Sequence, residues 1–299
     1  MKPETRSFYE QVVQRAVDRI ATRLDDALDL ETIAADACLS PFHFHRIFRG
    51  MVGETPLELS RRLRMERAAW QLAKTDRPVT AIAFDAGYEA HEAFTRAFRA
   101  AYSASPSGFR QRTYPRIELG ATCGVHFNPD GIVRAFIHRD SGGRTMDVTI
   151  ENMPELRVGA VHHVGPYNQI PNAFRKLGEI ANASGIVEKP GVAMLAIYHD
   201  DPETTPANEL RSEAALTFGA DAKLPTGLDE HRLPGGRYAH TTHVGPYEEL
   251  GDVWARFMGE WLPASGERIA NSPSYEIYRN TPMDTPKEKL RTDLYIPLQ

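Results

Sequence analysis

The sequence predicts an all-α tandem helix-turn-helix domain followed by an α+β domain of two repeated β-α-β-β units. Two internal repeats predict this division. Residues 33–39, IAADACL, are echoed by residues 82–88, IAFDAGY, and a segment with helical periodicity follows each copy. The pentapeptide His-Val-Gly-Pro-Tyr occurs at residues 163–167 and again 80 residues later, at 243–247, among strand-like runs. Such self-similarity indicates that one unit was copied in each half of the chain.

The domain boundaries follow from these patterns. We assign residues 1–113 to the helix-turn-helix domain, residues 114–145 to a linker with a possible hairpin, and residues 146–299 to the duplicated domain. The linker is rich in turn residues, including residues 128–131, and contains a short apolar run at residues 132–137. A chain of 299 residues is expected to form about two domains, each with its own core.

The charge is divided unevenly along the chain. The formal net charge is −5, yet residues 40–112 hold 12 Lys and Arg against 7 Asp and Glu. A basic region in an acidic protein favours contact with a polyanion there, although a solvated basic surface gives the same count. The two cysteines lack a zinc-binding pattern, and the chain has no signal-peptide core and no apolar run of about 18 residues. We therefore expect a cytoplasmic protein with no membrane partner.

Helical periodicity predicts the elements of the first domain. A first helix runs from Phe8 to Leu24, and Ser40 with Pro41 fits the start of a later one. A helix from about Pro56 to Ala73 connects the two copies. Its roughly 17 residues, at about 1.5 Å each, would hold the second helices of the two copies some 25 Å apart. With tilt or DNA bending, this spacing suits adjacent major grooves about 34 Å apart.

The second helix of each copy has an apolar stripe opposite a polar one. In the first copy Phe44, Ile47, Phe48 and Met51 are expected in the core. The opposite stripes mix Arg, His, Thr and aromatic side chains, which suit base edges, thymine methyl groups and phosphates. For any single residue a solvated face is the alternative. We predict DNA contacts for Phe42, His45, Arg46, Arg49, His91, Glu92, Thr95 and Arg96.

Residues 10–112 resemble the DNA-binding domain of the AraC/XylS family of transcriptional regulators. The resemblance is carried by residues 30–34, 40–48, 87–88, 94–98 and 105–110. It implies double-stranded DNA as a partner. It places Phe42, His45 and Arg46 at DNA-facing positions of the second helix in the first copy, and His91, Glu92 and Arg96 at those of the second helix in the second copy. These two helices are called the reader helices.

Two residues depart from that family. Ser103 stands where a glycine usually ends the last reader helix, and Glu92 presents an acid to DNA. Glu92 could accept a hydrogen bond from a cytosine amino group or orient Arg96.

The second half reads as two matching sets of strands and helices. Strand-like runs lie at residues 148–150, 158–164, 192–199, 214–218, 238–244, 275–278 and 294–297, with helices near 172–183 and 247–261. The 80-residue offset pairs Tyr198 with Tyr278 without a gap. A pseudo-symmetric pair of units forms a shared crevice at its seam, where a small ligand could bind.

One position breaks this symmetry, because Glu276 stands where the offset gives Ala196. Strand alternation places Ser274, Glu276 and Tyr278 on one face. A carboxylate among aromatic rings attracts an organic cation. An exposed strand glutamate is the simpler alternative. We predict an effector site formed by Glu276, Tyr278, Tyr198, Trp254 and Tyr247.

The repeated histidines, His163 and His243, are interpreted as structural groups at strand ends, because no third ligand follows either at a useful spacing. No metal and no cofactor are predicted.

Residues 146–299 resemble a GyrI-like effector-binding domain, most clearly at residues 243–247, 275–278 and 290–298. In such domains a carboxylate at the position of Glu276 commonly faces the ligand pocket, often for cationic or amphipathic compounds. Together the two resemblances imply a transcriptional regulator in which an effector near Glu276 changes how the first domain engages DNA or RNA polymerase.

Two other functions remain open on the sequence. Glu276 with nearby tyrosines could act as an acid or base in a small-molecule hydrolase, as some GyrI-like proteins are hydrolases. The acidic second half could instead dock another protein as a ligand-free adaptor. A regulator is preferred because the sequence shows no catalytic triad, metal cluster or phosphate loop.

Overall fold

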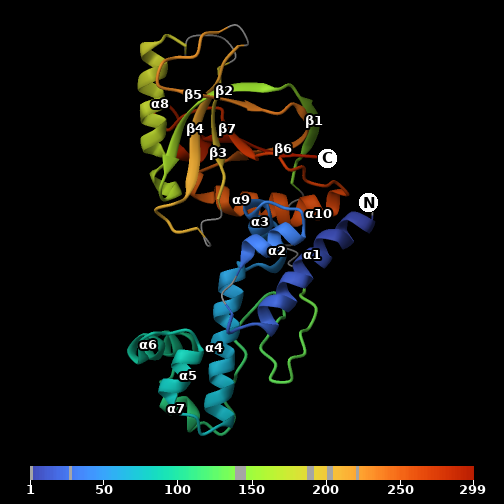
Figure 1. Cartoon of the computed structure of the whole chain (residues 1–299), viewed down its shortest axis with the longest axis vertical. Coiled ribbons are helices and arrows are strands. Elements are labelled where there is room, and N and C mark those ends of the chain that lie inside the picture. Colours follow the sequence, from blue (N-terminus) through green and yellow to red (C-terminus); the bar gives the residue numbers. More distant parts are fainter. Residues whose placement is uncertain (1–2, 27–28, 139–145, 187–191, 201–204, 220–221) are drawn as a thin grey trace.

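The computed structural model describes residues 8–26, 29–138, 146–186, 192–200, 205–219 and 222–299, and the backbone alone for residues 3–7. The molecule is elongated, with a helical body at one end and a sheet domain with its helices at the other (Figure 1). Among the helices described, none is long and apolar enough to cross a membrane.

Seven helices form the helical body in the described residues. The first six lie where the repeats and the periodicity predict helices, whereas the short last helix was not predicted. They are α1 (Pro3–Thr22), α2 (Leu30–Asp36), α3 (Pro41–Val52), α4 (Pro56–Lys74), α5 (Val79–Asp85), α6 (His91–Tyr102) and α7 (Pro106–Arg110). Ser40 caps α3 through its side chain, and Thr55 forms a reciprocal capping box with Glu58 at the start of α4. The predicted helical class of this body is confirmed.

Each helix-turn-helix copy has its own core at one end of α4. Phe44, Ile47 and Phe48 are buried with α1 and the first part of α4. Phe94 and Phe98 are buried with the second part of α4. Helix α4 is therefore the rigid spacer between the copies (Figure 1).

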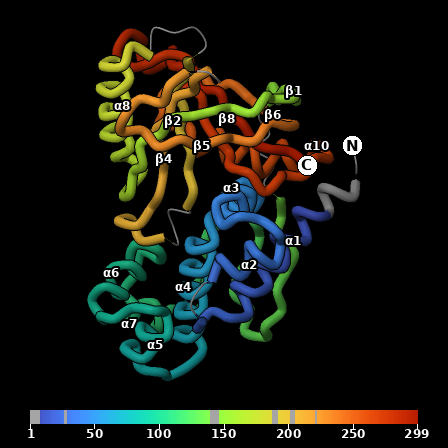
Figure 2. The backbone as a smooth tube through the Cα atoms, turned by 45° about the horizontal axis from the view of Figure 1, so that its top comes forward, coloured from blue at the N-terminus to red at the C-terminus, as the bar shows by residue number. Residues whose placement is uncertain are grey.

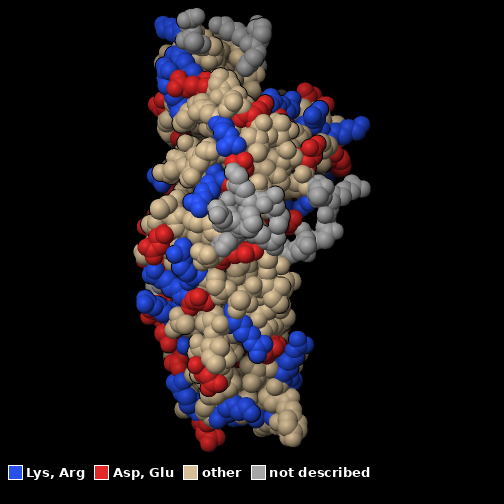
Figure 3. Space-filling model, turned by 90° about the vertical axis from the view of Figure 1, so that its right-hand side faces the viewer, with Lys and Arg blue, Asp and Glu red and all other residues tan. Residues whose placement is uncertain are grey.

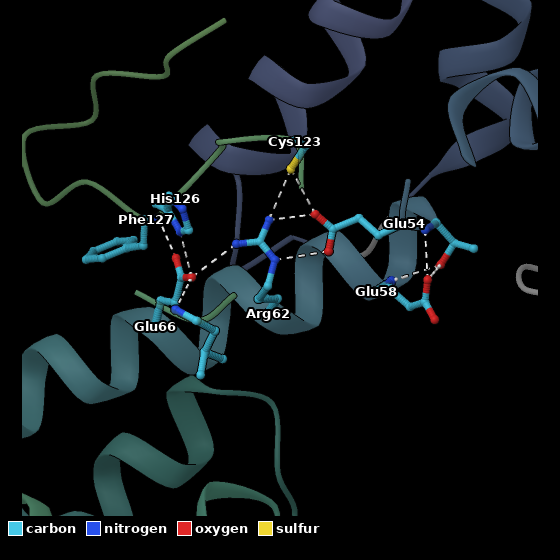
Figure 4. Close-up of polar contacts among 9 residues, drawn as sticks. Glu54, Glu58, Arg62, Glu66, Cys123, His126 and Phe127 are labelled. Carbon is cyan, nitrogen blue, oxygen red and sulfur yellow. Dashed lines mark hydrogen bonds and ion pairs between the residues drawn. The ribbon is translucent and has the colours of Figure 1, made fainter. Parts of the chain in front are cut away.

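The segment after α7 returns along α4 and α1 as an extended strap, seen in both backbone views (Figures 1 and 2). Residues 114–138 contain no strand, so the possible hairpin is not seen in them, and residues 139–145 lie outside the described residues. Backbone N–H groups of the strap instead find an acceptor in Glu66 of α4. The fully buried Glu66 carboxylate accepts from the N–H of Leu119 at 2.9 Å and of Phe127 at 2.8 Å (Figure 4).

The second body is a curled, fully antiparallel sheet. Its strands are β1 (Thr149–Met153), β2 (Leu156–Val164), β3 (Met194–Tyr198), β4 (Arg211–Thr217), β5 (Asp229–Leu233), β6 (Gly236–Val244), β7 (Tyr275–Tyr278) and β8 (Arg291–Pro297). Their order is β1-β6-β8-β7-β3-β4-β2-β5. The α+β class is confirmed. Strand β5 is not among the predicted runs, because its residues, DEHRL, lack an apolar stretch.

Helices cover one face of this sheet. Helix α8 (Pro171–Ala183) packs on β2 and β4. In the other half, α9 (Leu250–Arg256) continues through a π-helical turn (Phe257–Trp261) into α10 (Leu262–Ser265). A single apolar cluster runs from α1 and α3 into α9, this turn and β8. The two bodies thus share a core where α3 meets α9.

Candidate effector site and DNA-reading faces

The central strand pair places Glu276 at the seam of the sheet. Strand β3 pairs with β7 in antiparallel register, and Ala196 lies opposite Glu276. The Glu276 side chain points to the helix-covered face and is only 2% exposed. The alternative of an exposed strand glutamate is therefore wrong.

Aromatic side chains surround this carboxylate. Trp254 of α9 donates its indole N–H to Glu276 Oε1 at 2.5 Å, and the Tyr278 hydroxyl donates to Oε2 at 2.7 Å. The Tyr198 hydroxyl lies 3.5 Å from that of Tyr278, and the Tyr247 ring packs 5.3 Å from the Tyr278 ring. All five residues predicted for the effector site thus meet around one buried anion.

A cation from the helical body completes the cluster. The Arg46 guanidinium of α3 lies 5.2 Å from the centre of the Trp254 ring and 4.7 Å from that of Phe42. Cation–π contacts of this kind are favourable, and more so away from water. A side chain that the sequence assigned to DNA therefore lies on the candidate effector site.

The electrostatics of this cluster are those of a desolvated anion. Burial raises the pKa of Glu276, while hydrogen bonds from Trp254 and Tyr278 and the charge of Arg46 act in the opposite direction. Burial lowers the pKa of Arg46 to about 10, and the charge of Glu276 opposes that fall. The anion and the cation each reduce the penalty of removing the other from water.

The prediction that the second stripe of α3 faces solvent is wrong for this conformation. Phe42 and His45 are buried, and Arg46 is half-buried against the sheet domain. Arg49 forms an ion pair with Asp252 of α9 at 3.1 Å. Helical periodicity identified a second stripe on α3 but could not show that α9 covers it. The assignment of these four side chains to DNA stays a prediction.

The face of α6 that we predicted to contact DNA is exposed to solvent. His91, Glu92, Arg96 and Arg99 are exposed, and Thr95 is half-buried with its hydroxyl 3.5 Å from His91 Nε2. The opposite flank of the molecule mixes Lys and Arg with Asp and Glu without a patch of one sign (Figure 3). The predicted DNA-contacting side chains are therefore mostly exposed on α6 and mostly covered on α3 in this conformation.

Residues that the sequence did not single out hold α3 in place. A Cβ on Gly259 would lie 2.2 Å from Gly50 Cα, so the backbones of α3 and the π-helical turn touch directly. His43 Nε2 lies 3.0 Å from the Ser274 hydroxyl, and both side chains are buried. The glycines at positions 50 and 259 were the sequence signal available for this close contact, but neither internal repeat relates the two positions.

Comparison with known proteins fits this architecture. Residues 146–299, more than half of the chain, match the family described as the GyrI-like small molecule binding domain. The chain belongs to the GyrI-like family. Residues 7–112 match a helix-turn-helix domain of the AraC type, so both predicted resemblances are confirmed.

Curated relatives match one part or the other. The DNA gyrase inhibitor of Yersinia enterocolitica is 34% identical over 137 residues, which are 44% of this chain and 84% of that protein. Probable transcriptional regulator YgiV of Escherichia coli is 27% identical over 157 residues, 52% of this chain and 97% of that one. Regulatory protein SoxS of Salmonella typhimurium is 32% identical over 104 residues, 35% of this chain and 97% of that one. Among these relatives, the GyrI-like domain and the AraC-type domain of this chain thus match different proteins.

Proposed function

We propose that the protein is a transcriptional regulator that binds double-stranded DNA through its AraC-type domain and senses a small organic cation at Glu276 of its GyrI-like domain. The observation that carries this proposal is the position of Arg46. One side chain of a DNA-reading helix lies on the aromatic cluster that would receive the ligand. Arg46 therefore links the ligand site to a DNA-reading helix.

Charge defines the class of ligand. A buried carboxylate is costly unless a cation or hydrogen-bond donors compensate it. Glu276 has two donors, Trp254 and Tyr278, and the rings of Tyr198 and Tyr247 lie close to Tyr278. Arg46 supplies the positive charge in this conformation. A flat or bulky organic cation would present the same charge to the same ring faces.

Ligand binding and docking of α3 then exclude one another. With Arg46 in place, Phe42 and His45 are buried and α3 cannot enter a major groove. A cation that displaces Arg46 favours an open state in which α3 joins α6 on DNA. The coupling equals the difference in the ligand's affinity for the closed and open states.

The test uses tetraphenylphosphonium, a bulky aromatic cation, and an operator selected from random duplex DNA with the full chain. We expect the cation to bind the wild type and to tighten operator binding at fixed salt. Glu276→Gln, which removes the charge but keeps the shape, should weaken cation binding about 10-fold or more, as expected for loss of a buried charge partner. Glu179→Gln on the exposed side of α8 is the matched control. A cation that binds at Glu276 yet leaves operator affinity unchanged would remove the coupling.

A hydrolase is the second candidate. The raised pKa of Glu276, caused by burial, and the Tyr278 hydroxyl at 2.7 Å suit general acid–base chemistry. Product formation that disappears in Glu276→Gln would favour this function, whereas tight binding without turnover would favour sensing.

Contact with RNA polymerase stays a prediction from the family resemblance, and transcription with purified polymerase, with and without the cation, tests it.

We infer that the sheet consists of two copies of one unit. Strands β1 and β5, β2 and β6, and β4 and β8 begin 80 residues apart, at residues 149 and 229, 156 and 236, and 211 and 291. The strand order matches itself when read from either edge under this pairing. Each unit then has an additional leading strand, β-β-α-β-β, and the proposed domain boundaries at 113 and 145 leave both units intact.

A further inference from the structure

A cluster of histidines surrounds a buried carboxylate on the sheet face opposite Glu276. Glu213 of β4 is 5% exposed. Its neighbours come from separate strands: His162 lies on β2, His231 on β5, and His199 follows β3. The register sets His162 directly opposite Glu213 and His231 opposite Val158, one strand farther out. Neither repeat in the sequence brings these four positions together.

The distances within the cluster are short. His162 Nδ1 lies 3.3 Å from Glu213 Oε1, and His231 Nε2 lies 3.7 Å from Oε2. The ligand atoms of His162, Glu213 and His231 all lie within 4.8 Å of one another. Two ligands of a tetrahedral zinc ion, each about 2.0–2.1 Å from it, are about 3.3–3.4 Å apart. Two of the separations in the cluster, 3.3 and 3.7 Å, are close to this value, and side-chain rotations that shorten the longer ones would bring all three groups onto one ion.

The remaining nitrogens of the cluster support this arrangement. His162 Nε2 faces Asp229 Oδ2 at 3.5 Å, and a metal-bound histidine usually directs its second nitrogen to a carboxylate or carbonyl. His199 Nε2 contacts Glu213 Oε1 at 3.1 Å. The buried Nε2 of His231 has no hydrogen-bond partner among the described residues. In the tautomer that leaves this nitrogen unprotonated, it can serve as a metal ligand beside the Glu213 carboxylate.

The other half of the sheet shows what such a carboxylate needs. The 80-residue offset takes Glu213 to Asp293, which is equally buried. Arg279 donates to Asp293 at 2.5 Å and the Thr242 hydroxyl donates at 2.6 Å. Arg279 and Thr242 stand where the first half has His199 and His162. A permanent guanidinium charge is thus replaced by imidazoles, which carry a charge only when protonated.

We propose that His162, Glu213 and His231 bind a divalent transition-metal ion, with zinc as the first candidate. Two imidazoles and one carboxylate form a three-ligand set that zinc accepts with water in the fourth position. The His162 side chain is 51% exposed, which leaves the site open to solvent on one side. The ion would join β2, β4 and β5 and supply the positive charge that Arg279 gives the other half.

Isothermal titration of zinc chloride into tag-free, metal-stripped full-length protein tests the proposal. We expect one zinc ion per chain, and tetrahedral absorption bands when cobalt(II) replaces zinc. His162→Ala and His231→Ala should each weaken zinc binding about 10-fold or more, in line with the loss of a metal-site residue. His163→Ala is the control, because His163 is adjacent in sequence but contacts the Pro166 carbonyl. Absence of stoichiometric zinc binding to the wild type, or equal affinities in all three variants, would overturn the assignment.

A second variant separates the metal from the fold. His199→Arg places at position 199 the residue type that the offset gives at Arg279. The guanidinium should pair with Glu213, keep the chain folded and reduce zinc affinity about 10-fold or more. Unchanged zinc affinity in this variant would contradict the charge argument. These titrations need neither operator nor organic cation, so their outcome is independent of the proposed regulatory function.

Discussion

His43 is a titratable group enclosed between α3 and the sheet domain. Burial, with the charge of Arg46, lowers its pKa from 6.5 to about 4. Its neutral ring contacts the Ser274 hydroxyl. Between pH 6.5 and 4 the unfolded chain binds a proton that the folded chain refuses, so acid reduces stability in this window.

The variant His43→Gln isolates that effect, because glutamine does not titrate and can still contact Ser274. As the pH falls from 7 to 4, the wild type should lose about 3 kcal/mol of unfolding free energy relative to the variant. Urea titrations across this range measure the difference, in which the other titratable groups cancel. Parallel pH profiles for the two proteins would show that His43 is not held neutral.

The sequence identified five residues that lie together around Glu276, but it did not reveal that the outer face of α3 is covered, and both outcomes have identifiable reasons. Glu276 was found because the offset sets it against Ala196, and alternation then selected its face. Arg46 has the pattern of a DNA-reading residue, and the pattern is unchanged when another domain covers it. Glu213 and its histidines share no local motif, so only strand pairing reveals them.

At the scale of elements, the two reader helices end in the same way with different residues. Gly53 caps α3 with φ 85°, and Ser103 caps α6 with φ 53°. Both N–H groups bond to a carbonyl four residues back, that of Arg49 and that of Arg99. The left-handed conformation costs a non-glycine residue roughly 1–2 kcal/mol. Serine in place of the usual glycine at position 103 therefore adds backbone strain but does not move the end of the helix.

Ser103→Gly should stabilise the second helix-turn-helix copy by about 0.5–1 kcal/mol, since relief of strain exceeds the added chain entropy. Gly53→Ser, the reverse change at the other cap, should destabilise the first copy by a similar amount. Thermal or urea unfolding of both variants provides the measurement. Loss of stability in Ser103→Gly would refute the assigned strain.

Glu66 fastens the strap to α4, and Figure 4 shows the contacts that depend on it. Its carboxylate accepts from the N–H groups of Leu119 and Phe127, lies 2.9 Å from His126 Nδ1 and pairs with Arg62 at 3.1 Å. Each buried donor left without a partner costs about 1–3 kcal/mol. The contacts of Glu66 with the strap join residues more than 50 positions apart, so local turn signals could not predict the strap.

Glu66→Ala should therefore lower the unfolding free energy by about 2–4 kcal/mol and expose residues 117–127 to proteolysis. Glu58→Ala, on the same helix, removes only a capping interaction and should cost about 1 kcal/mol. Urea unfolding and limited proteolysis compare the two variants. An equal effect of both would show that the strap is held by apolar packing alone.

At the scale of the molecule, the two domains form one closed unit in which α3 belongs to both. Its apolar stripe fills the helix-turn-helix core, and its polar stripe packs on α9. Both repeats predicted the content of each domain, but neither contains information on how one domain docks on the other. Under the proposed function, α6 contacts DNA without ligand, and α3 does so only in the liganded state.

The most direct test is the operator affinity of Gly259→Ala at fixed salt in the absence of any ligand. The added methyl group would collide with the backbone of Gly50 and separate α3 from the π-helical turn. It would leave every residue predicted to contact DNA unchanged. Gly178→Ala on α8 is the control, because a Cβ there meets no atom within 4 Å. If the open state is populated at about 1–10% in the wild type, Gly259→Ala should tighten operator binding roughly 10-fold or more, and the control should not change it. Equal operator affinities for the wild type, Gly259→Ala and Gly178→Ala would contradict the claim that docking of α3 restrains DNA binding.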